Sequence, residues 1–185
     1  MGEITQSQTK AIREFGRTFF KNSKQEPFEF TDGQCEMFHA IVNPDIKWVW
    51  ISAPTRYGKS ETLALAVLTL AFMYNLKVPI VAGTEEKARK IMEYVLQHIS
   101  DHPKIYDGLL NVEFIRKAER VKVQMSKQGL RWSTGGWIYI TSVDARTLSR
   151  EGEGVVGEGG DVIILEEAGL IREKDQFSKV VRMIE

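Results

Sequence analysis

Ile51-Ser-Ala-Pro-Thr-Arg-Tyr-Gly-Lys-Ser-Glu61 is the stretch of this chain that predicts its fold. An apolar run, Trp48-Val-Trp-Ile51, leads into it, and a longer apolar run over residues 63–72 follows. A buried strand, a tight loop ending in Gly-Lys-Ser and then a helix is the setting of a phosphate-binding P-loop. The successive N–H groups of such a loop and the N-terminus of the helix form a cradle for anions. The stretch therefore predicts a nucleotide-phosphate site.

Different residues of this loop are expected to bind different parts of a nucleotide. Lys59 is expected to reach the β- and γ-phosphates of ATP, and the Ser60 hydroxyl is expected to bind Mg²⁺. Gly58 lets the backbone approach the phosphates because it has no side chain. The alternative is an ordinary strand–turn–helix with an exposed lysine. The predicted nucleotide-binding residues are Ala53, Pro54, Thr55, Arg56, Tyr57, Gly58, Lys59 and Ser60, with Ala53 standing where the motif usually has glycine.

Length and composition fit one soluble globular domain with a sizeable core. The chain has 185 residues and a formal net charge of zero, so a strong overall attraction to nucleic acid is not available. Charge is unevenly distributed, however: residues 104–150 hold nine basic and four acidic residues, and residues 151–175 hold eight acidic and two basic ones. The sequence has no run of eighteen apolar residues, which argues against a membrane span. Cys35 is the single cysteine, so no internal disulfide can form, as in a cytoplasmic protein.

The first part of the chain predicts helices. Residues 5–24 form an amphipathic pattern, with an apolar face and a basic stripe that can contact DNA or a neighbouring subunit, or can simply face solvent. The apolar face is Ile12, Phe15 and Phe19, and the basic stripe is Lys10, Arg13, Arg17, Lys21 and Lys24. A second short helix is expected over residues 32–42. We assign residues 1–26 to an N-terminal amphipathic helix and residues 27–185 to the core domain.

Later segments alternate strands with helices. A core strand is expected over residues 77–82, and Thr84 is expected to cap a helix whose apolar stripe runs from Ala88 to Ile99. Residues 120–142 show strand-like alternation, and the glycine-rich residues 152–160 lead into the apolar run Val162-Ile-Ile-Leu165. This order predicts an α/β fold: a mainly parallel, doubly wound sheet flanked by helices, with its ligand at the carboxyl ends of the strands.

Two carboxylates follow the last apolar run, in Val162-Ile-Ile-Leu-Glu-Glu167. Phosphoryl transfer needs an acid beside the Mg²⁺ shell, and hydrolysis needs one that orients or activates water. Glu166 suits the first role and Glu167 the second, provided that the strand ends there, because adjacent strand residues point to opposite faces. The alternative is a strand that simply leaves the core. A kinase needs no water-activating acid, so the pair favours a hydrolytic motor with a catalytic-glutamate site.

Four segments, taken in order, resemble the ATPase domain of viral large terminases, the motors that package DNA into capsids. Phe30-Thr-Asp-Gly-Gln34 is similar to the segment whose glutamine reads adenine, and residues 53–60 resemble the family's P-loop, including an arginine inside it, Arg56. Residues 78–88 resemble the strand–turn–helix that follows. Residues 157–168 resemble the glycine-bearing loop that leads into the acidic strand.

The resemblance implies ATP-driven translocation of double-stranded DNA by a homo-oligomeric ring in the host cytoplasm, with a portal and a small terminase subunit as partners. It also implies an arginine that reaches a neighbour's γ-phosphate; Arg56, Arg146 and Arg150 are the candidates, although the surface interpretation is the favoured one for Arg146 and Arg150. Glu166 stands where the family usually has aspartate. The chain stops at Glu185, before the family's coupling strand and nuclease domain, so we expect a portion of the ATPase domain and assign no nuclease activity.

Two other functions stay open on the sequence alone: a helicase-like DNA-dependent ATPase, and an assembly module that binds ATP without hydrolysing it. The remaining residues of chemical interest are expected to be structural. His98 and His102 have no third metal ligand in view and are assigned to a helix surface. The four tryptophans are assigned to the core rather than to base stacking: Trp48, Trp50, Trp132 and Trp137.

Overall fold

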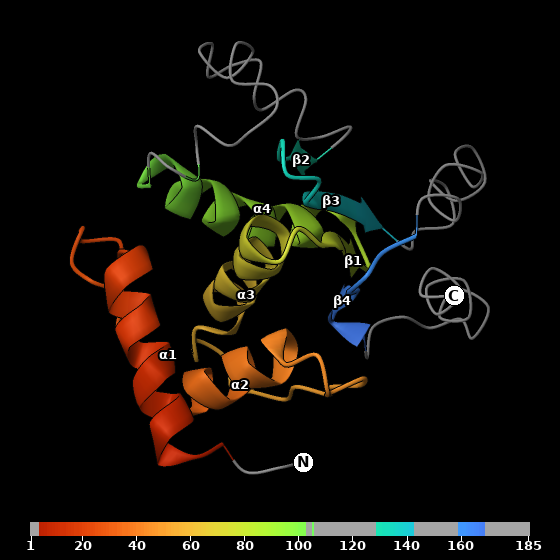
Figure 1. Cartoon of the computed structure of the whole chain (residues 1–185). Helices are drawn as coiled ribbons and strands as arrows, with labels where there is room; N and C mark the ends of the chain where they lie inside the picture. The colour runs from red at the N-terminus through yellow and green to blue at the C-terminus, as the bar shows by residue number, and fades with distance from the viewer. Residues whose placement is uncertain (1–3, 103–104, 106–128, 143–158, 169–185) are drawn as a thin grey trace, which may run out of the picture.

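The computed structural model describes residues 4–102, 105, 129–142 and 159–168 of the chain. Helices and strands follow one another along the chain as Figure 1 shows. The helices are α1 (Gln6–Phe19), α2 (Asp32–Val42), α3 (Lys59–Met73) and α4 (Glu85–Ser100). The strands are β1 (Lys77–Ala82), β2 (Leu130–Arg131), β3 (Trp137–Ser142) and β4 (Ile164–Glu166).

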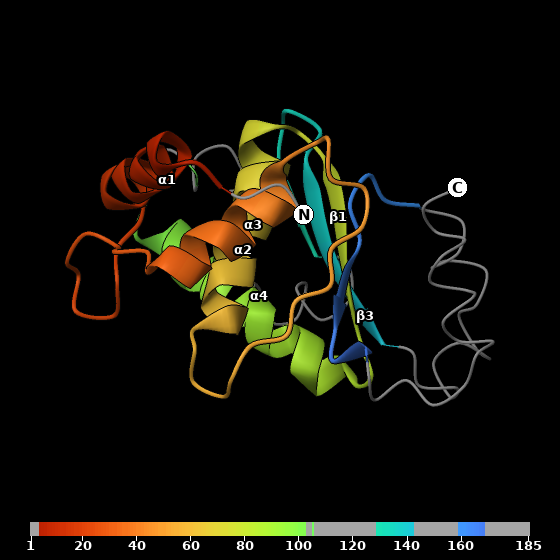
Figure 2. The same cartoon turned by 90° about the horizontal axis from the view of Figure 1, so that it is seen from below.

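The strands form one four-stranded, mostly parallel sheet in the order β2-β3-β1-β4. Central strand β1 pairs in parallel with β3 on one side and with β4 on the other, and only β2 runs antiparallel to its neighbour. The register sets Ala82 opposite Glu166 and opposite Ser142, so the carboxyl ends of three strands meet at one edge. The four described helices lie on one side of these strands (Figure 2). The prediction of an α/β fold with a mainly parallel sheet is confirmed, whereas helices on both faces, as a doubly wound sheet has, are not seen among the described residues.

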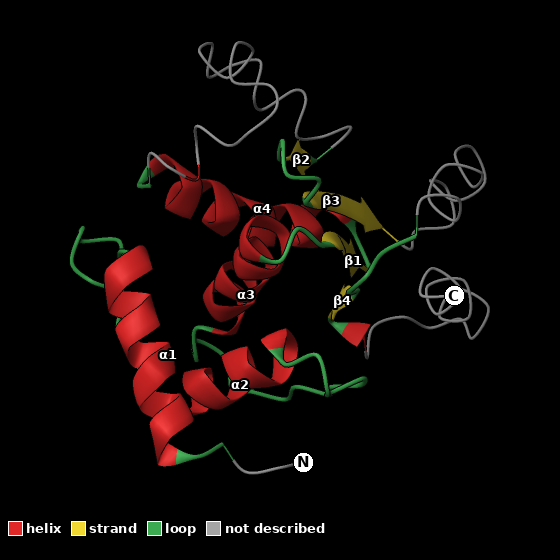
Figure 3. Ribbon diagram, in the orientation of Figure 1, coloured by secondary structure: helices red, strands yellow, loops and turns green. Residues whose placement is uncertain are grey.

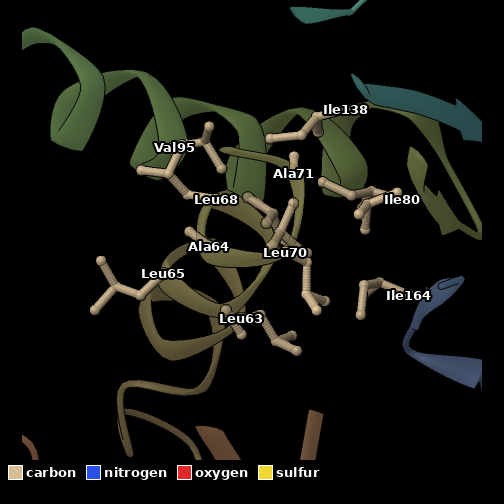
Figure 4. Packing of buried hydrophobic residues seen from close by; sticks show 14 of the residues in the cluster. Leu63, Ala64, Leu65, Leu68, Leu70, Ala71, Ile80, Val95, Ile138 and Ile164 are labelled. Carbon is tan, nitrogen blue, oxygen red and sulfur yellow. The ribbon is translucent and has the colours of Figure 1, made fainter. Parts of the chain in front are cut away.

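Helix α3 forms the centre of the core. Its residues from Thr62 to Ala71 are all buried, which is what a helix that is apolar around its whole circumference requires. Leu63, Leu68 and Leu70 lie close to Val95 of α4 and to Ile80, Ile138 and Ile164 of the three parallel strands in Figure 4. Full burial of one such leucine stabilises the fold by about 1.5–3 kcal/mol. Packing around α3 therefore fixes the position of its N-terminus, where the predicted loop lies.

The segment before that loop is not a strand, and this part of the prediction was wrong. Residues 46–54 have no helix or strand assignment and are drawn as loop in Figure 3. The assignment of Trp48 and Trp50 to the core was also wrong, since they are 70% and 73% exposed. Central strand β1 already has a partner on each side, so the segment cannot pair with it. The segment is extended along the protein, with Val49 and Ile51 half-buried and the indoles outward.

The predicted core position is confirmed for Trp132 and partly for Trp137. Trp132 is fully buried, and its indole N–H donates a hydrogen bond to the carbonyl oxygen of Ile105 at 3.2 Å. Trp137 is half-buried on β3, against the ring of Tyr139. A buried indole needs such an acceptor for its polar N–H, which explains why Trp132 is tolerated in the core.

Helix α1 is shorter than predicted: it ends at Phe19 and not at residue 24. The Asn22 side chain accepts hydrogen bonds from the N–H groups of Lys24 and Glu26, and this turn replaces the helical pattern. The predicted basic stripe is divided as a result. Arg13 and Arg17 form ion pairs with Asp32 and Glu29, both at 2.6 Å, which attach α1 to the first residue of α2 and to the segment before it.

Several elements agree with the sequence prediction in detail. Helix α2 and strand β1 have the predicted limits, and α4 begins after Thr84, although the Thr84 side chain makes no capping hydrogen bond. The strand-like residues 121–125 and most of the glycine-rich loop lie outside the described residues. In the described part of the chain, no helix combines the length and apolar character needed to cross a bilayer.

Candidate functional site

The loop at the start of α3 has the backbone of an anion cradle. Arg56 and Gly58 both adopt left-handed conformations, with φ of 66° and 81°. Alternation of this kind turns successive N–H groups toward the inside of a loop. Gly58 is the N-cap of α3 and supplies no side-chain acceptor, so the first-turn N–H groups of the helix are not capped by it. Residues 53–60 therefore leave backbone donors for an anionic ligand.

The N-terminus of α2 packs directly against this loop. A Cβ atom added at Gly58 would collide with the side-chain amide of Gln34, and one added at Gly33 would collide with the Tyr57 hydroxyl. Gln34 is buried, and its Oε1 accepts the N–H of Thr31 at 2.9 Å in a capping box. The predicted adenine-reading glutamine thus lies beside the loop that is predicted to bind phosphate. It also has a structural role that the sequence analysis did not anticipate.

Lys59 and Glu166 come together where α3 begins and β4 ends. The Lys59 Nζ lies 3.2 Å from the Glu166 Oε1. Glu166 is the last residue of β4 and is only 9% exposed, at the edge where the parallel strands have their carboxyl ends. The ammonium group supplies the counter-charge that a carboxylate this buried requires. The lysine predicted to bind phosphate and the carboxylate predicted to bind the metal are therefore in direct contact.

Glu167 points to a different partner. The strand ends before it, as its predicted role required, and Glu167 takes a left-handed conformation with φ of 53°. Its carboxylate forms an ion pair with the Nζ of Lys87, in the first turns of α4. Lys87 is not among the residues that the sequence predicts for this site. The signal was available, because a helix that follows β1 must begin at the edge where β1 and β4 have their carboxyl ends.

The other predicted site residues lie around the same loop. Ser60 is half-buried in the first turn of α3, Ala53 is half-buried, and Pro54, Thr55 and Arg56 are exposed. Arg146 and Arg150 lie outside the described residues. No group of three or more His, Cys, Asp or Glu side chains placed to bind a metal is found in the described part of the chain. A hydroxyl and one carboxylate nevertheless fit Mg²⁺, which takes its remaining ligands from phosphates and water.

The first turn of α3 also carries a second acid–base contact. The Glu61 Oε1 lies 3.9 Å from the Nε2 of His98, on α4. His98 is 2% exposed, so its assignment to a helix surface was wrong. Phe20 and Phe28, from the turn after α1, pack edge-on against its ring. Burial lowers the pKa of His98 from 6.5 to about 4, and burial raises the pKa of Glu61.

Comparison with known proteins adds no assignment. No protein-family model matches the chain, and no curated protein matches it.

Proposed function

We propose that this chain is the ATPase core of a DNA-packaging motor of the large-terminase type, a P-loop enzyme that hydrolyses Mg-ATP to move double-stranded DNA. The observation that carries the proposal is the contact between Lys59 and Glu166 beside a loop with two left-handed residues. A lysine that follows a glycine-containing loop and lies beside a carboxylate at the end of a parallel strand supports a phosphoryl-transfer site, in which the lysine binds phosphates and the acid lies beside the metal.

Lys59 is the residue that binds the phosphates. Its side chain is 29% exposed and pairs with a single carboxylate, so polyphosphate oxygens can compete for the ammonium group. The uncapped N–H groups at the start of α3 add donors on the same side of the loop. Gly58 keeps the backbone accessible between them. Together these groups select a ligand with several closely spaced negative oxygens.

Ser60 and Glu166 are the residues that would hold Mg²⁺, through a hydroxyl and a carboxylate oxygen. The bound ion would neutralise charge that develops on the phosphates during transfer. Glu166 has a longer side chain than the aspartate usual in terminases. Its position as the last residue of β4, with Lys59 as its neighbour, keeps the carboxylate beside the loop despite this difference.

Glu167 is the residue proposed to orient the attacking water. It follows Glu166 directly and is 37% exposed, so it can reach solvent next to the loop. The DNA-translocation part of the proposal rests on the resemblance of the four ordered segments to terminases. So do the ring assembly, the portal and small-subunit partners and the host cytoplasm. Arg56, exposed in the loop, is the described candidate for an arginine that acts across subunits.

One observation favours a second function, an assembly module that binds ATP without turnover. The Glu167 carboxylate is engaged by Lys87 and is directed toward α4. A base that orients water must have a lone pair available to the water. With its carboxylate bound to Lys87, Glu167 is not arranged to activate water in this structure.

Glu167→Gln separates the two functions. For the ATPase we expect turnover to fall by about 100-fold or more while ATP still binds, because the amide cannot accept a proton from water. Turnover is measured with and without duplex DNA, and ATP affinity by titration of a fluorescent analogue. Equal hydrolysis by Glu167→Gln and the parent protein would show that the assigned role is wrong. ATP binding without turnover in the parent protein would favour the assembly module.

A further inference from the structure

The side-chain amide of Gln34, beside the loop at the start of α3, has its oxygen and its nitrogen in different environments. Oε1 accepts the N–H of Thr31 at 2.9 Å, and this bond fixes the orientation of the amide, because an NH₂ group cannot accept. Nε2 is therefore the atom that faces the loop. It is the Gln34 atom nearest to the Cβ position of Gly58, whereas Oε1 lies more than 4 Å from that position. The loop side of Gln34 is thus a hydrogen-bond donor only.

This donor is available to a ligand. The capping box uses the Oε1 of Gln34 and its backbone N–H, which donates to the Thr31 hydroxyl at 3.3 Å, and Nε2 takes part in neither bond. Gln34 is only 7% exposed, but its Nε2 is not one of the fully enclosed, unpartnered polar atoms of the described residues. Nε2 therefore remains reachable, and water or a ligand must supply its acceptor.

Adenine and guanine present different groups to such a donor. Beside the N7 acceptor, adenine carries an amino donor at N6, whereas guanine carries a second acceptor, O6. A glutamine selects adenine when its oxygen accepts from N6 and its nitrogen donates to N7. Gln34 has only its nitrogen on the loop side. An NH₂ group matches the two acceptors of guanine at least as well as the single acceptor of adenine.

We propose that Gln34 is a donor-only contact to the base, and that the site accepts GTP at least as readily as ATP. The inference rests on the proposed function, because it needs a nucleoside triphosphate bound at the loop. Lys59 and the loop N–H groups bind phosphates and do not distinguish bases. Tyr57, whose hydroxyl lies against Gly33, is 39% exposed, and an aromatic ring stacks on either purine. The substrate class is therefore the purine nucleoside triphosphates and not ATP alone.

The first test compares the dissociation constants of ATP and GTP for the parent protein. Both are measured with Mg²⁺, by competition against a fluorescent nucleotide analogue. We expect GTP to bind more tightly than ATP, or less tightly by under about fivefold. A site that reads adenine through a bidentate contact would favour ATP by about 5- to 150-fold.

The second test is Gln34→Glu, which reverses the hydrogen-bonding character of the loop side. Glutamate also closes a capping box, so one oxygen still accepts the N–H of Thr31 while the other turns an acceptor toward the loop. The added charge weakens both nucleotides, but GTP loses more, because an acceptor suits N6 of adenine and repels O6 of guanine. We expect the preference to shift toward ATP by about fivefold or more. Gln8→Glu makes the same change in the capping box of α1 and should leave the preference unchanged.

An ATP preference of about fivefold or more in the parent protein would overturn the inference. A preference that Gln34→Glu leaves unchanged would also overturn it, since Gln34 would then not contact the base. Lys59→Ala gives the background of binding in the same titrations. If the parent protein binds neither nucleotide above that background, the proposed function itself fails. If it binds ATP tightly and GTP poorly, the function stands and the donor-only role of Gln34 fails.

Discussion

The first turn of α3 makes two acid–base contacts that differ in almost every physical respect. On one face, Lys59 lies 3.2 Å from Glu166 at the open edge of the sheet. On another, Glu61 lies 3.9 Å from His98 inside an aromatic cluster with Phe20 and Phe28. Residues two apart on a helix face different directions. Lys59 therefore faces the edge of the sheet, while Glu61 faces the buried side of α4.

The difference shows how burial decides what a pair of ionisable residues can do. Lys59 is partly exposed, so it can exchange its carboxylate partner for a phosphate. His98 is enclosed, and burial lowers its pKa to about 4 while burial raises the pKa of Glu61. Desolvation therefore favours the neutral form of each residue in the second contact. The first contact is suited to ligand binding, and the second lies inside the aromatic packing between α3, α4 and the turn after α1.

Replacing the glutamate of each contact by glutamine gives the largest expected difference in ATP turnover between the two contacts. Glu166→Gln should lower ATP turnover by about 100-fold or more, because it removes the carboxylate assigned to the Mg²⁺ shell. Glu61→Gln is the matched variant two residues from Lys59, and it should change turnover less than twofold. Steady-state hydrolysis of both variants is the measurement. A loss of turnover in Glu61→Gln as large as that in Glu166→Gln would remove the distinction between the two contacts.

The His98 contact predicts a loss of stability in acid. The pKa of His98 is about 4 in the folded state and 6.5 in the unfolded state. Between these two pH values the unfolded chain therefore binds a proton at His98 and the folded chain does not. The stability that comes from keeping His98 neutral is fully present above pH 6.5 and is lost as the pH falls toward 4. The free energy of unfolding decreases by about 3 kcal/mol in total over this range. The raised pKa of Glu61 acts in the opposite direction and offsets part of the loss.

Urea unfolding between pH 7.5 and pH 4.5 measures this effect. His98→Leu removes the titrating group and serves as the reference at each pH. The free energy of unfolding of the parent protein should fall relative to that of His98→Leu as the pH decreases. A difference between the two proteins that is constant over this range would show that His98 is not held neutral.

A glycine substitution at the loop has a smaller effect on stability. Gly58→Ala should destabilise the fold by about 1–3 kcal/mol, because Gly58 has φ of 81° and its new Cβ would collide with Gln34. Gly83→Ala is the matched control, since a Cβ there has nothing within 4 Å. Thermal unfolding and ATP binding are measured for both. Equal stability of the two variants would contradict the close packing of Gln34 against the loop.

Much of the fold was predictable because local pattern and packing agree. The limits of α2 follow from Thr31 at its N-cap and Asn43-Pro44 after its end, and β1 is a continuous apolar run that becomes the central strand. The approach of Lys59 to Glu166 followed from the rule that helices and strand ends meet at one edge of a parallel sheet.

The errors arose where tertiary context outweighs local pattern. Trp48-Val-Trp-Ile51 is as apolar as β1, but apolarity does not say which strands β1 will pair with, and the described structure has both its edges occupied. His98 was assigned to the surface because helical spacing cannot reveal that Phe20 and Phe28 cover it from a distant turn. Lys87 was missed because nothing in its local sequence distinguishes it from the other basic residues at the start of α4, although the topology brings that helix start to the end of β4.

Binding of ATP to the parent protein and to Lys59→Ala tests the central claim most directly. Titration with a fluorescent ATP analogue, with and without Mg²⁺, is compared for these two proteins and for Lys90→Ala, a lysine on the exposed face of α4. We predict saturable binding to the parent protein and to Lys90→Ala, and a loss of about 100-fold or more in affinity for Lys59→Ala. Equal affinity of all three proteins, or no saturable binding to the parent, would contradict the assignment of a phosphate site to the start of α3.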